Sequence, residues 1–394
     1  MKSLKVLCGS GVALALTALV WVGATGRTEA ADPIKIGASL SLTGRFSDAA
    51  KYVQEGYQLW VDETNKKGGI DGHPVELVVY DDESNPDTGR LLAERLIERD
   101  NVLLVLGPFS SAITDAVATV TERAEVPLFA AIASDISLWE RRNLNWTFQG
   151  YPSSNYDHEG FLKILDGKKG QVKKLAIVYE EVGYSERAKD WAAAKAREMG
   201  LTVEAYGYTP GSQDFRSIVE RIVAFGPEAV TMGGQYQGSI ALTRQMIERG
   251  FNPIAYHFNP ASDGSTKGAL GDNADGIFGY SVWEPTLPAE DSQAFTKLYQ
   301  GAYGHLPSYH SAVAFSAGQV VEAAIKAKGT DRAGIRDFLA TNEVKTIVAN
   351  YKVNEKGQQE GYRYLEVQWQ DGELKIVGGD SPNAVKWPKP EWKK

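Results

Sequence analysis

Short apolar runs alternate with amphipathic stretches along most of this chain, and that alternation limits the possible folds more than any other feature. The apolar runs have the length of buried strands, and the stretches between them repeat their apolar residues at helical spacing. In the first half we expect strands at 34–38, 75–80, 102–106 and 127–131, with helices at 52–65, 86–97 and from 111 onward. Strands that alternate with helices form parallel sheets covered by those helices, so the sequence predicts an α/β fold.

A second series of the same kind begins near Val172. We expect strands there at 175–179, 202–208, 229–232 and 253–257, and helices at 185–199, 215–224 and 239–249. The two series share their order of elements without an obvious sequence repeat of about 20–50 residues. This doubling of topology predicts two Rossmann-like lobes, each built on a parallel sheet.

Three segments have the character of crossings between the lobes. Segment 141–155 is polar, aromatic and turn-rich, and segments 283–288 and 350–358 break the element pattern further along. Two helical stretches, 291–303 and 310–328, and a strand-rich end follow Tyr280. We therefore expect a three-crossing hinge, with lobe 1 at 31–149 plus 281–351, lobe 2 at 150–280 plus 352–380, and a C-terminal tail at 381–394.

The first 30 residues have the features of a cleavable export signal. Lys2 and Lys5 supply a basic region, residues 11–22 an apolar core, and Thr28 and Ala30 small residues where a signal peptidase cuts. The apolar core, at about 12 residues, is shorter than the ~20 that a membrane span needs, which favours a signal over a retained anchor. Leu7 before Cys8 does not fit a lipoprotein cleavage site, so we expect no lipid anchor.

Without that segment the chain has 364 residues, enough for two domains. Cys8 is the only cysteine in the sequence, so the mature chain would have no disulfide, no catalytic thiol and no cysteine metal ligand. Removing Lys2, Lys5, Arg27 and Glu29 leaves 39 basic and 49 acidic residues, a formal net charge of −10. This charge disfavours nucleic acid and anionic lipid as partners.

Ser110 and Ser111 follow a Gly-Pro break after the expected strand at 102–106 and open a helix. The unpaired N–H groups and partial positive charge at a helix N-terminus bind anions, and serine hydroxyls add donors. A serine at this position is also a common N-cap with no ligand role. The turn at 233–239 follows the expected strand at 229–232 in the same way, so the two turns are expected to face each other across a cleft.

The sequence offers little for catalysis. It contains no Gly-x-Ser-x-Gly elbow, no Walker loop and no Gly-x-Gly-x-x-Gly after a strand. The five histidines are dispersed, and His305 and His310 do not share a helical face. We expect neither an enzyme nor a metal or other cofactor.

The chain resembles the type I periplasmic substrate-binding proteins of ABC importers, in the branched-chain amino-acid and amide (Leu/Ile/Val-binding protein) group. The resemblance covers the whole mature chain. It is most specific in an N-terminal block of about 50 residues, which contains Ile36-Gly37, Leu42-Thr43-Gly44, Asn65, Gly68-Gly69-Ile70, Gly72, Asp81-Asp82 and Pro86.

The resemblance implies a set of ligand-binding residues. Ser111 matches the serine that binds the ligand carboxylate, Ser110 precedes it, and Ala133 falls where a backbone group contacts the same carboxylate. Tyr184 and Tyr236 match tyrosines that close from the second lobe. Asn259 lies where the family often has an acid for the ligand ammonium, with Asp263 as a nearby alternative, and Phe46 and Phe109 are wall residues near the mouth.

Asp135 departs from the pattern, because the family has a threonine for the α-amino group at this position. It could bind a ligand amine in place of the acid missing near Asn259, or it could cap a helix that begins at Ile136. Tyr184 and Tyr236 have a second interpretation as packing residues at the lobe boundary.

The resemblance thus implies a monomeric periplasmic protein that captures a small carboxylate-bearing ligand and delivers it to an ABC permease in the inner membrane. An amino acid is the leading ligand class, and an aromatic or other organic acid is the alternative. A ligand-sensing receptor partner of the same fold is the alternative role.

Overall fold

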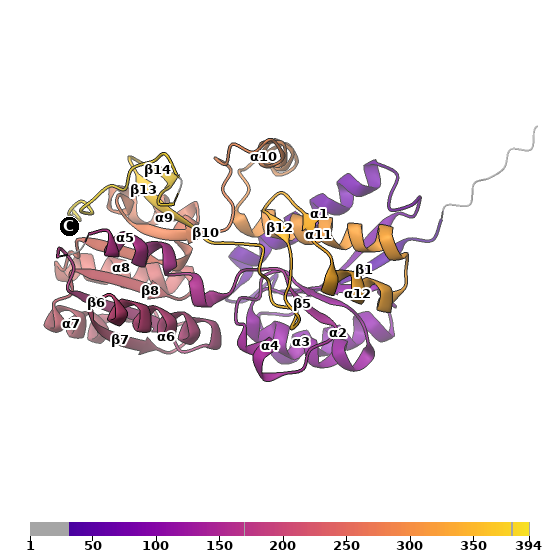
Figure 1. Ribbon diagram of the computed structural model, residues 1–394, viewed down its shortest axis with the longest axis horizontal. Helices are drawn as coiled ribbons and strands as arrows, with labels where there is room; N and C mark the ends of the chain where they lie inside the picture. The colour runs from indigo at the N-terminus through magenta and orange to yellow at the C-terminus, as the bar shows by residue number, and fades with distance from the viewer. Residues whose placement is uncertain (1–30, 169, 380, 394) are drawn as a thin grey trace, which may run out of the picture. The chain divides into compact units, whose positions relative to one another are not determined.

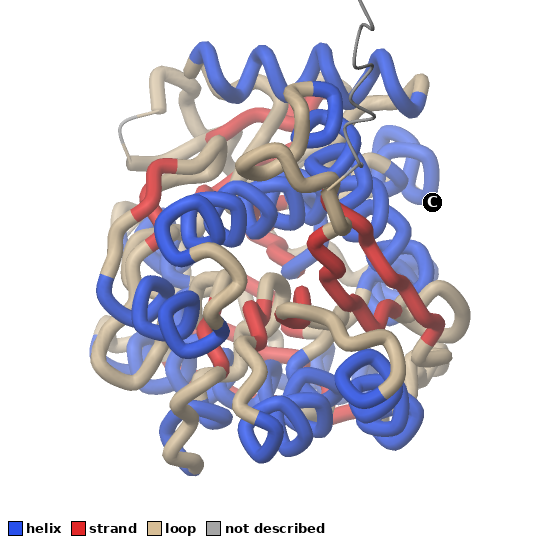
Figure 2. The backbone as a smooth tube through the Cα atoms, turned by 90° about the vertical axis from the view of Figure 1, so that its right-hand side faces the viewer, coloured by secondary structure: helices blue, strands red, loops and turns tan. Residues whose placement is uncertain are grey.

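The structure is a computed structural model that describes residues 31–168, 170–379 and 381–393, and residues 32–394 form one compact unit. The predicted export signal lies outside the described residues. Strands and helices alternate along the unit, with the strands inside and the helices around them (Figures 1 and 2). The prediction of an α/β fold with parallel sheets is confirmed.

The first sheet has five parallel strands in the order β2-β1-β3-β4-β5. The strands are β1 (Ile34–Leu40), β2 (Val75–Asp81), β3 (Leu104–Leu106), β4 (Leu128–Ala130) and β5 (Thr147–Gln149). The helices after them are α1 (Ser47–Lys66), α2 (Pro86–Glu98), α3 (Ser111–Ala124) and α4 (Ser137–Arg141). Because β5 belongs to this sheet, the segment 141–155 is only in part a crossing, and the chain leaves the first lobe after Gln149.

The second sheet has seven strands in the order β14-β13-β10-β9-β8-β6-β7, in which β13 runs antiparallel to both of its neighbours, β10 and β14. The strands are β6 (Lys174–Glu180), β7 (Thr202–Tyr208), β8 (Ala229–Gly233), β9 (Ala255–Phe258), β10 (Phe278–Ser281), β13 (Leu365–Gln370) and β14 (Glu373–Ile376). Its helices are α5 (Glu159–Asp166), α6 (Gly183–Glu198), α7 (Arg216–Phe225), α8 (Tyr236–Arg249) and α9 (Ser265–Leu270). The 3₁₀ turns η1 (Ser154–Tyr156), η2 (Asn259–Ser262) and η3 (Gly271–Ala274) lie between these elements.

The chain returns to the first lobe after β10. There it forms α10 (Glu290–Tyr303), α11 (Tyr309–Lys328), α12 (Arg332–Thr341) and the short strands β11 (Val344–Lys345) and β12 (Asn350–Tyr351). A third crossing leads from β12 to β13, so the chain passes between the lobes three times (Figure 1). The core of the first lobe is continuous from the sheet through α1 and α11, and the second lobe has its own clusters.

Local chemistry explains several of these elements. Asn85 caps α2 by accepting hydrogen bonds from the backbone N–H groups of Asp87 and Thr88, and Pro86 occupies the first turn, where no N–H is needed. Helices α1 and α11 approach closely because Gly318 faces the ring of Trp60. No helix among the described residues is long and apolar enough to cross a membrane. In the same ranges, no group of three or more His, Asp or Glu side chains could hold a metal ion.

Candidate functional site

A cavity of about 610 Å³ lies between the carboxyl ends of the strands of the two lobes. The first lobe contributes the β1–α1 loop, the start of α3 and the turn after β4, and also the start of α11. The second lobe contributes the turns after β6, β7 and β8 and the segment that follows β9. Apart from the start of α11, which follows α10, each of these segments lies between a strand and the helix after it, which is where α/β sheets place their ligands.

Ser110 and Ser111 stand in the cavity wall at the start of α3. Ser110 is the N-cap, and its Oγ accepts a hydrogen bond of 3.3 Å from the backbone N–H of Ile113. Ser111 Oγ accepts hydrogen bonds from the backbone N–H groups of Ser134 (3.2 Å) and Asp135 (3.1 Å), which fixes the turn after β4. These bonds use the lone pairs of Ser111, so its hydroxyl proton can be donated to an acceptor in the cavity.

Asp135 lies at the contact between the lobes and is 4% exposed. Its Oδ1 accepts a hydrogen bond of 3.0 Å from the backbone N–H of Ser137, at the start of α4. Its Oδ2 faces Gly183, the first residue of α6 in the other lobe, and a Cβ on that glycine would stand 2.3 Å from Oδ2. One carboxylate oxygen therefore supports a local turn, while the other touches the opposing helix start.

Tyrosines and glutamine form the polar wall of the second lobe. Gln235 Nε2 donates a hydrogen bond of 3.1 Å to Tyr184 Oη. Tyr236 is the first residue of α8, and Tyr208 Oη reaches the start of the same turn, where a Cβ on Gly234 would lie only 1.9 Å away. Burial raises the pKa of Tyr236 to about 12 and that of Tyr184 well above its ordinary value, so both hydroxyls stay protonated at neutral pH.

One ion pair crosses the cavity. Arg45 Nη1, from the β1–α1 loop, lies 3.1 Å from Glu180 Oε1, at the end of β6, and the Arg45 guanidinium lies 4.4 Å from the ring centroid of Phe46. The Glu180 side chain is 1% exposed. Burial raises the pKa of its carboxyl, and the neighbouring Arg45 opposes that rise.

The rest of the wall is aromatic. The rings of Phe46 and Phe109 have centroids 5.4 Å apart, and Phe109 lies 5.3 Å from His310. Burial lowers the pKa of His310 to about 3, so this imidazole is neutral at physiological pH. Three more tyrosines near the crossings, called the hinge tyrosines below, complete the lining: Tyr151 after β5, Tyr280 in β10 and Tyr309 at the start of α11.

Seven of the nine predicted ligand residues line this cavity, namely Phe46, Phe109, Ser110, Ser111, Asp135, Tyr184 and Tyr236. Ala133 and Asn259 are not among the lining residues. Ala133 is fully buried, and its carbonyl oxygen accepts a hydrogen bond from Gln149. Asn259 is also buried, and its Nδ2 donates to Asp157 Oδ2 at 2.8 Å. Asp263, the alternative to Asn259, does line the cavity.

The sequence interpretation missed Arg45, Glu180, Tyr208 and the hinge tyrosines. One signal was available, because Glu180 directly follows the expected strand at 175–179, at the sheet edge where ligands bind. The hinge tyrosines carried no local signal, since each comes from a different part of the chain.

Comparison with known proteins identifies the family. The sequence pattern of the periplasmic binding protein family matches residues 33–373. The chain belongs to this family. Leu/Ile/Val-binding protein homolog 7 of Brucella suis biovar 1 is 27% identical over 395 residues, covering 94% of this chain and 96% of that protein. Leu/Ile/Val-binding protein homolog 8 of Brucella abortus is 28% identical over 411 residues, covering 96% of each.

Solved structures agree with this periplasmic binding protein fold. A leucine-binding protein LivK from Thermotoga maritima has a TM-score of 0.80 at 22% identity, covering 89% of this chain and 99% of its own. A solute-binding protein of an ABC transporter from R. palustris, in complex with benzoate, has a TM-score of 0.79 at 18% identity, covering 91% and 99%. The predicted two-lobe fold and the predicted family are therefore both confirmed.

Proposed function

We propose that this periplasmic binding protein is the substrate-binding component of an ABC importer and captures a small carboxylate-bearing ligand in the cavity between its lobes. The observation that carries this proposal is the start of α3, where Ser110, Ser111 and the helix N-terminus line the cavity wall. A carboxylate there would receive a hydroxyl donor from Ser111 and the field of the helix dipole. Tyr184 and Tyr236 would contact the ligand from the second lobe.

An amino acid is the ligand class that we favour. The charged lining residues support it, because acids outnumber bases: Asp48, Asp115, Asp135, Glu180 and Asp263 against Arg45, Lys51 and Arg141. A wall with this excess of acid attracts a ligand that carries an amine as well as a carboxylate. The names of the Brucella relatives and of LivK agree with this choice.

An aromatic carboxylic acid is the second candidate, and the aromatic lining favours it. Phe46, Phe109, Tyr151, Tyr280 and Tyr309 offer ring faces and edges to a flat ligand. The benzoate-bound protein from R. palustris has the same fold.

We propose export by the N-terminal signal, a monomer in the periplasm, closure of the lobes around the ligand and docking of the closed form on a permease in the inner membrane. Lobe 1 would comprise residues 31–149 and 281–351, and lobe 2 residues 150–280 and 352–380, with 381–394 as a tail. We propose that Ala133 and Asn259 contribute to ligand binding indirectly, by supporting the residues that line the cavity. We also propose that the protein catalyses no reaction. Chemical change of a bound ligand by the purified protein would contradict that last point.

Calorimetry with amino acids and aromatic acids tests the ligand assignment, after mass spectrometry of the ligand released from protein purified without denaturation. We expect 1:1 binding and a loss of about tenfold or more in affinity for Ser111→Ala, because a hydrogen bond to a charged group is lost. Ser217→Ala, at an exposed serine in α7 outside the cavity lining, is the control and keeps the wild-type affinity. Equal affinity of Ser111→Ala and wild type would remove Ser111 from the carboxylate site.

A further inference from the structure

Glu180 is a buried carboxylate with one oxygen that takes part neither in the ion pair with Arg45 nor in the proposed carboxylate site. It ends strand β6, lines the cavity, and pairs through Oε1 with Arg45 of the other lobe at 3.1 Å. Its second oxygen, Oε2, is buried and forms no hydrogen bond of ordinary geometry with any residue that the structure describes. A buried carboxylate oxygen without a donor costs free energy, so a donor supplied from the cavity would be stabilised there.

Tyr208 gives a second observation at the same place. Tyr208 lines the cavity, and its buried hydroxyl likewise has no hydrogen-bond partner of ordinary geometry in the described part of the chain. Tyr208 is the register partner of Glu180 in the parallel pair of β6 and β7, so the two residues are neighbours on the same face of the sheet, and the charge of Glu180 adds to burial in raising the pKa of Tyr208. The N–H of Gly211 and the hydroxyl of Tyr184 also lie near enough to favour the charged form of Glu180. The cluster thus combines one anion with a phenol oxygen that can accept or donate.

The chemistry of this cluster selects its occupant. An ammonium group has several N–H donors and a positive charge, so it can bond to Glu180 Oε2 and to Tyr208 Oη together. A second carboxylate placed there would be repelled by Glu180. A ligand without any donor would leave Oε2 unsatisfied after water is displaced.

The other acids in the lining are less suited to an amine, Asp48 because it is exposed and Asp115 because it pairs with Arg142 at 3.2 Å. Asp135 uses Oδ1 for the N–H of Ser137, and its Oδ2 is held against Gly183. Asp263 accepts a hydrogen bond from the N–H of Ser265 and is only partly buried. Glu180 combines a side chain that is 1% exposed, a place in the cavity lining and an oxygen that has no hydrogen bond of ordinary geometry to any described residue.

We propose that Glu180, with Tyr208, forms the amine subsite of the cavity and thereby selects ligands that carry an ammonium group beside their carboxylate. This assignment rests on the proposed capture of a carboxylate and adds the second recognition element. Arg45 orients the Glu180 carboxylate through Oε1 and leaves Oε2 for the ligand.

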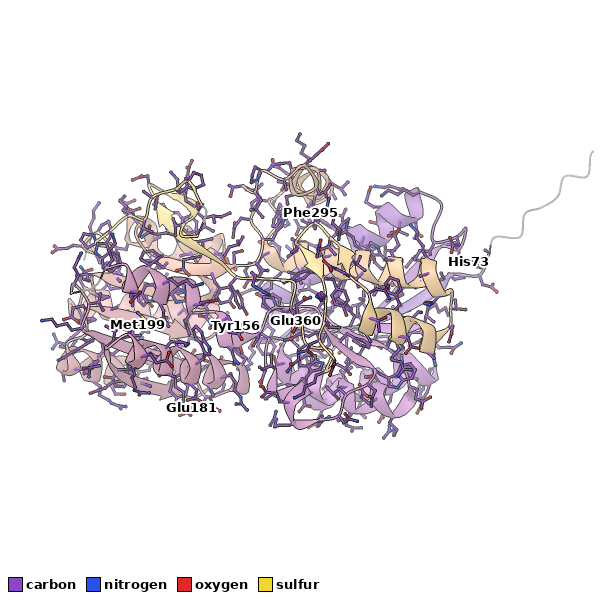
Figure 3. All side chains as sticks on the ribbon, in the orientation of Figure 1. His73, Tyr156, Glu181, Met199, Phe295 and Glu360 are labelled. Atoms are coloured by element: carbon purple, nitrogen blue, oxygen red, sulfur yellow. The ribbon has the colours of Figure 1, made fainter. Side chains whose placement is uncertain are left out.

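Matched pairs of probes test the assignment by calorimetry on the full mature chain. Each pair differs only in the amine: L-leucine with 4-methylpentanoate, and L-phenylalanine with 3-phenylpropanoate. We expect wild type to bind the amino acid of at least one pair more tightly than its deamino partner. Glu180→Gln should lower the affinity for that amino acid by about tenfold or more, and change the affinity for the deamino acid by about threefold at most. Glu181→Gln is the control, because Glu181 is exposed, lies outside the lining and sits at the edge of the second lobe (Figure 3).

Further variants separate an amine contact from a simple closing contact. Arg45→Met removes the ion pair but keeps Glu180, so we expect it to lower the affinity for the amino acid and the deamino acid alike. The subsite is supported if Glu180→Gln lowers the affinity for the amino acid alone while Arg45→Met lowers the affinity for both. Equal loss of both probes in Glu180→Gln overturns it, as does an amine-selective loss that occurs in Asp135→Asn and not in Glu180→Gln. If Glu180→Gln does not fold by circular dichroism, Tyr208→Phe replaces it, with a smaller loss that is still selective for the amine.

The wild type alone separates this inference from the proposed function. Tighter binding of both deamino acids than of their amino-acid partners overturns the amine subsite and leaves carboxylate capture standing. Failure of wild type to bind any of the four probes contradicts both.

Discussion

Ser110 holds a backbone conformation that residues with a side chain rarely adopt, with φ +91° and ψ 144°. This region is nearly exclusive to glycine, and a serine held there stores strain of about 1–3 kcal/mol. The strain lies at the cavity wall, where Ser110 also caps α3. The sequence has serine at a position where glycine would fit the backbone better, which agrees with a role for the serine hydroxyl.

Two substitutions at Ser110 separate strain from capping. We expect Ser110→Gly to be more stable than Ser110→Ala by about 1 kcal/mol or more, because glycine relieves the strain and costs little as a cap, whereas alanine keeps the strain and removes the cap. Urea unfolding of both variants without ligand measures the difference. Equal stability of the two variants would show that the backbone at this position is relaxed.

Among the elements, the packing of α1 against α11 depends most on a small residue. A Cβ on Gly318 would stand 2.2 Å from Cγ and Cδ2 of Trp60, a side chain that is 1% exposed and donates from Nε1 to Glu322. The ring cannot move away without breaking that hydrogen bond and disturbing the core. The close approach of the two helices therefore requires glycine here.

We expect Gly318→Ala to lower the free energy of unfolding by about 1–3 kcal/mol through overpacking. Gly301→Ala is the matched control, because Gly301 lies in α10 with no atom within 4 Å of its hypothetical Cβ. That control should gain up to about 1 kcal/mol from helix propensity. Thermal or urea unfolding measures both, and a Gly318→Ala variant as stable as Gly301→Ala would contradict the packing argument.

At the scale of the whole molecule, side-chain contacts beside the cavity join the two lobes. Asp135 against Gly183 is one of them and Arg45 with Glu180 is another. Neither contact stabilises one lobe by itself, since each joins residues of different lobes. Changes at these contacts should affect ligand affinity more than the stability of either lobe.

Gly183→Ala tests this separation. The added methyl group would meet Asp135 Oδ2 at 2.3 Å, so the lobes could not approach as closely. We expect ligand affinity to fall about tenfold, corresponding to about 1.4 kcal/mol of closing free energy, with little change in the urea midpoint. Gly268→Ala in α9 is the control and should keep the wild-type affinity, because a Cβ there meets no atom within 4 Å. Wild-type affinity in Gly183→Ala would show that the contact between Gly183 and Asp135 plays no part in closing the lobes.

Glu284 makes the stability of the whole chain depend on pH. It lies in the crossing after β10, is 9% exposed, and burial raises the pKa of its carboxyl to about 8. Its ordinary value of 4.5 applies to the unfolded chain. Between these values the folded protein holds a proton that the unfolded chain has released, so this contribution to stability is full below pH 4.5 and is lost as the pH rises toward 8.

We therefore expect Glu284→Gln to gain stability relative to wild type as the pH rises from 5 to 8, by as much as about 4 kcal/mol. Urea unfolding at several pH values measures the difference between the two proteins. Glu290→Gln, an exposed position at the start of α10, should follow wild type at every pH. If the difference in unfolding free energy between wild type and Glu284→Gln stays constant with pH, then Glu284 has the same pKa in the folded and the unfolded chain.

Much of the fold and part of the site could be predicted from the sequence. The strands from β6 to β9 fall within about two residues of their expected positions, because their apolar runs are bounded by clear turns. Strand β10 and helix α12 were missed, and β3 proved shorter than its apolar run, since Val102 and Leu103 are buried without joining the ladder. Burial alone does not tell a strand from a buried coil.

The sequence by itself determined the α/β class, the doubled topology, the family and the serine turn at the start of α3, because periodicity, turn residues and helix starts are encoded in neighbouring positions. Only the tertiary structure decided which groups meet in the cavity. Arg45 and Glu180 are 135 positions apart, and Asp135 touches Gly183 across the lobes. Such contacts depend on how two separately formed lobes are held by their hinge, and no local pattern of residues records that arrangement.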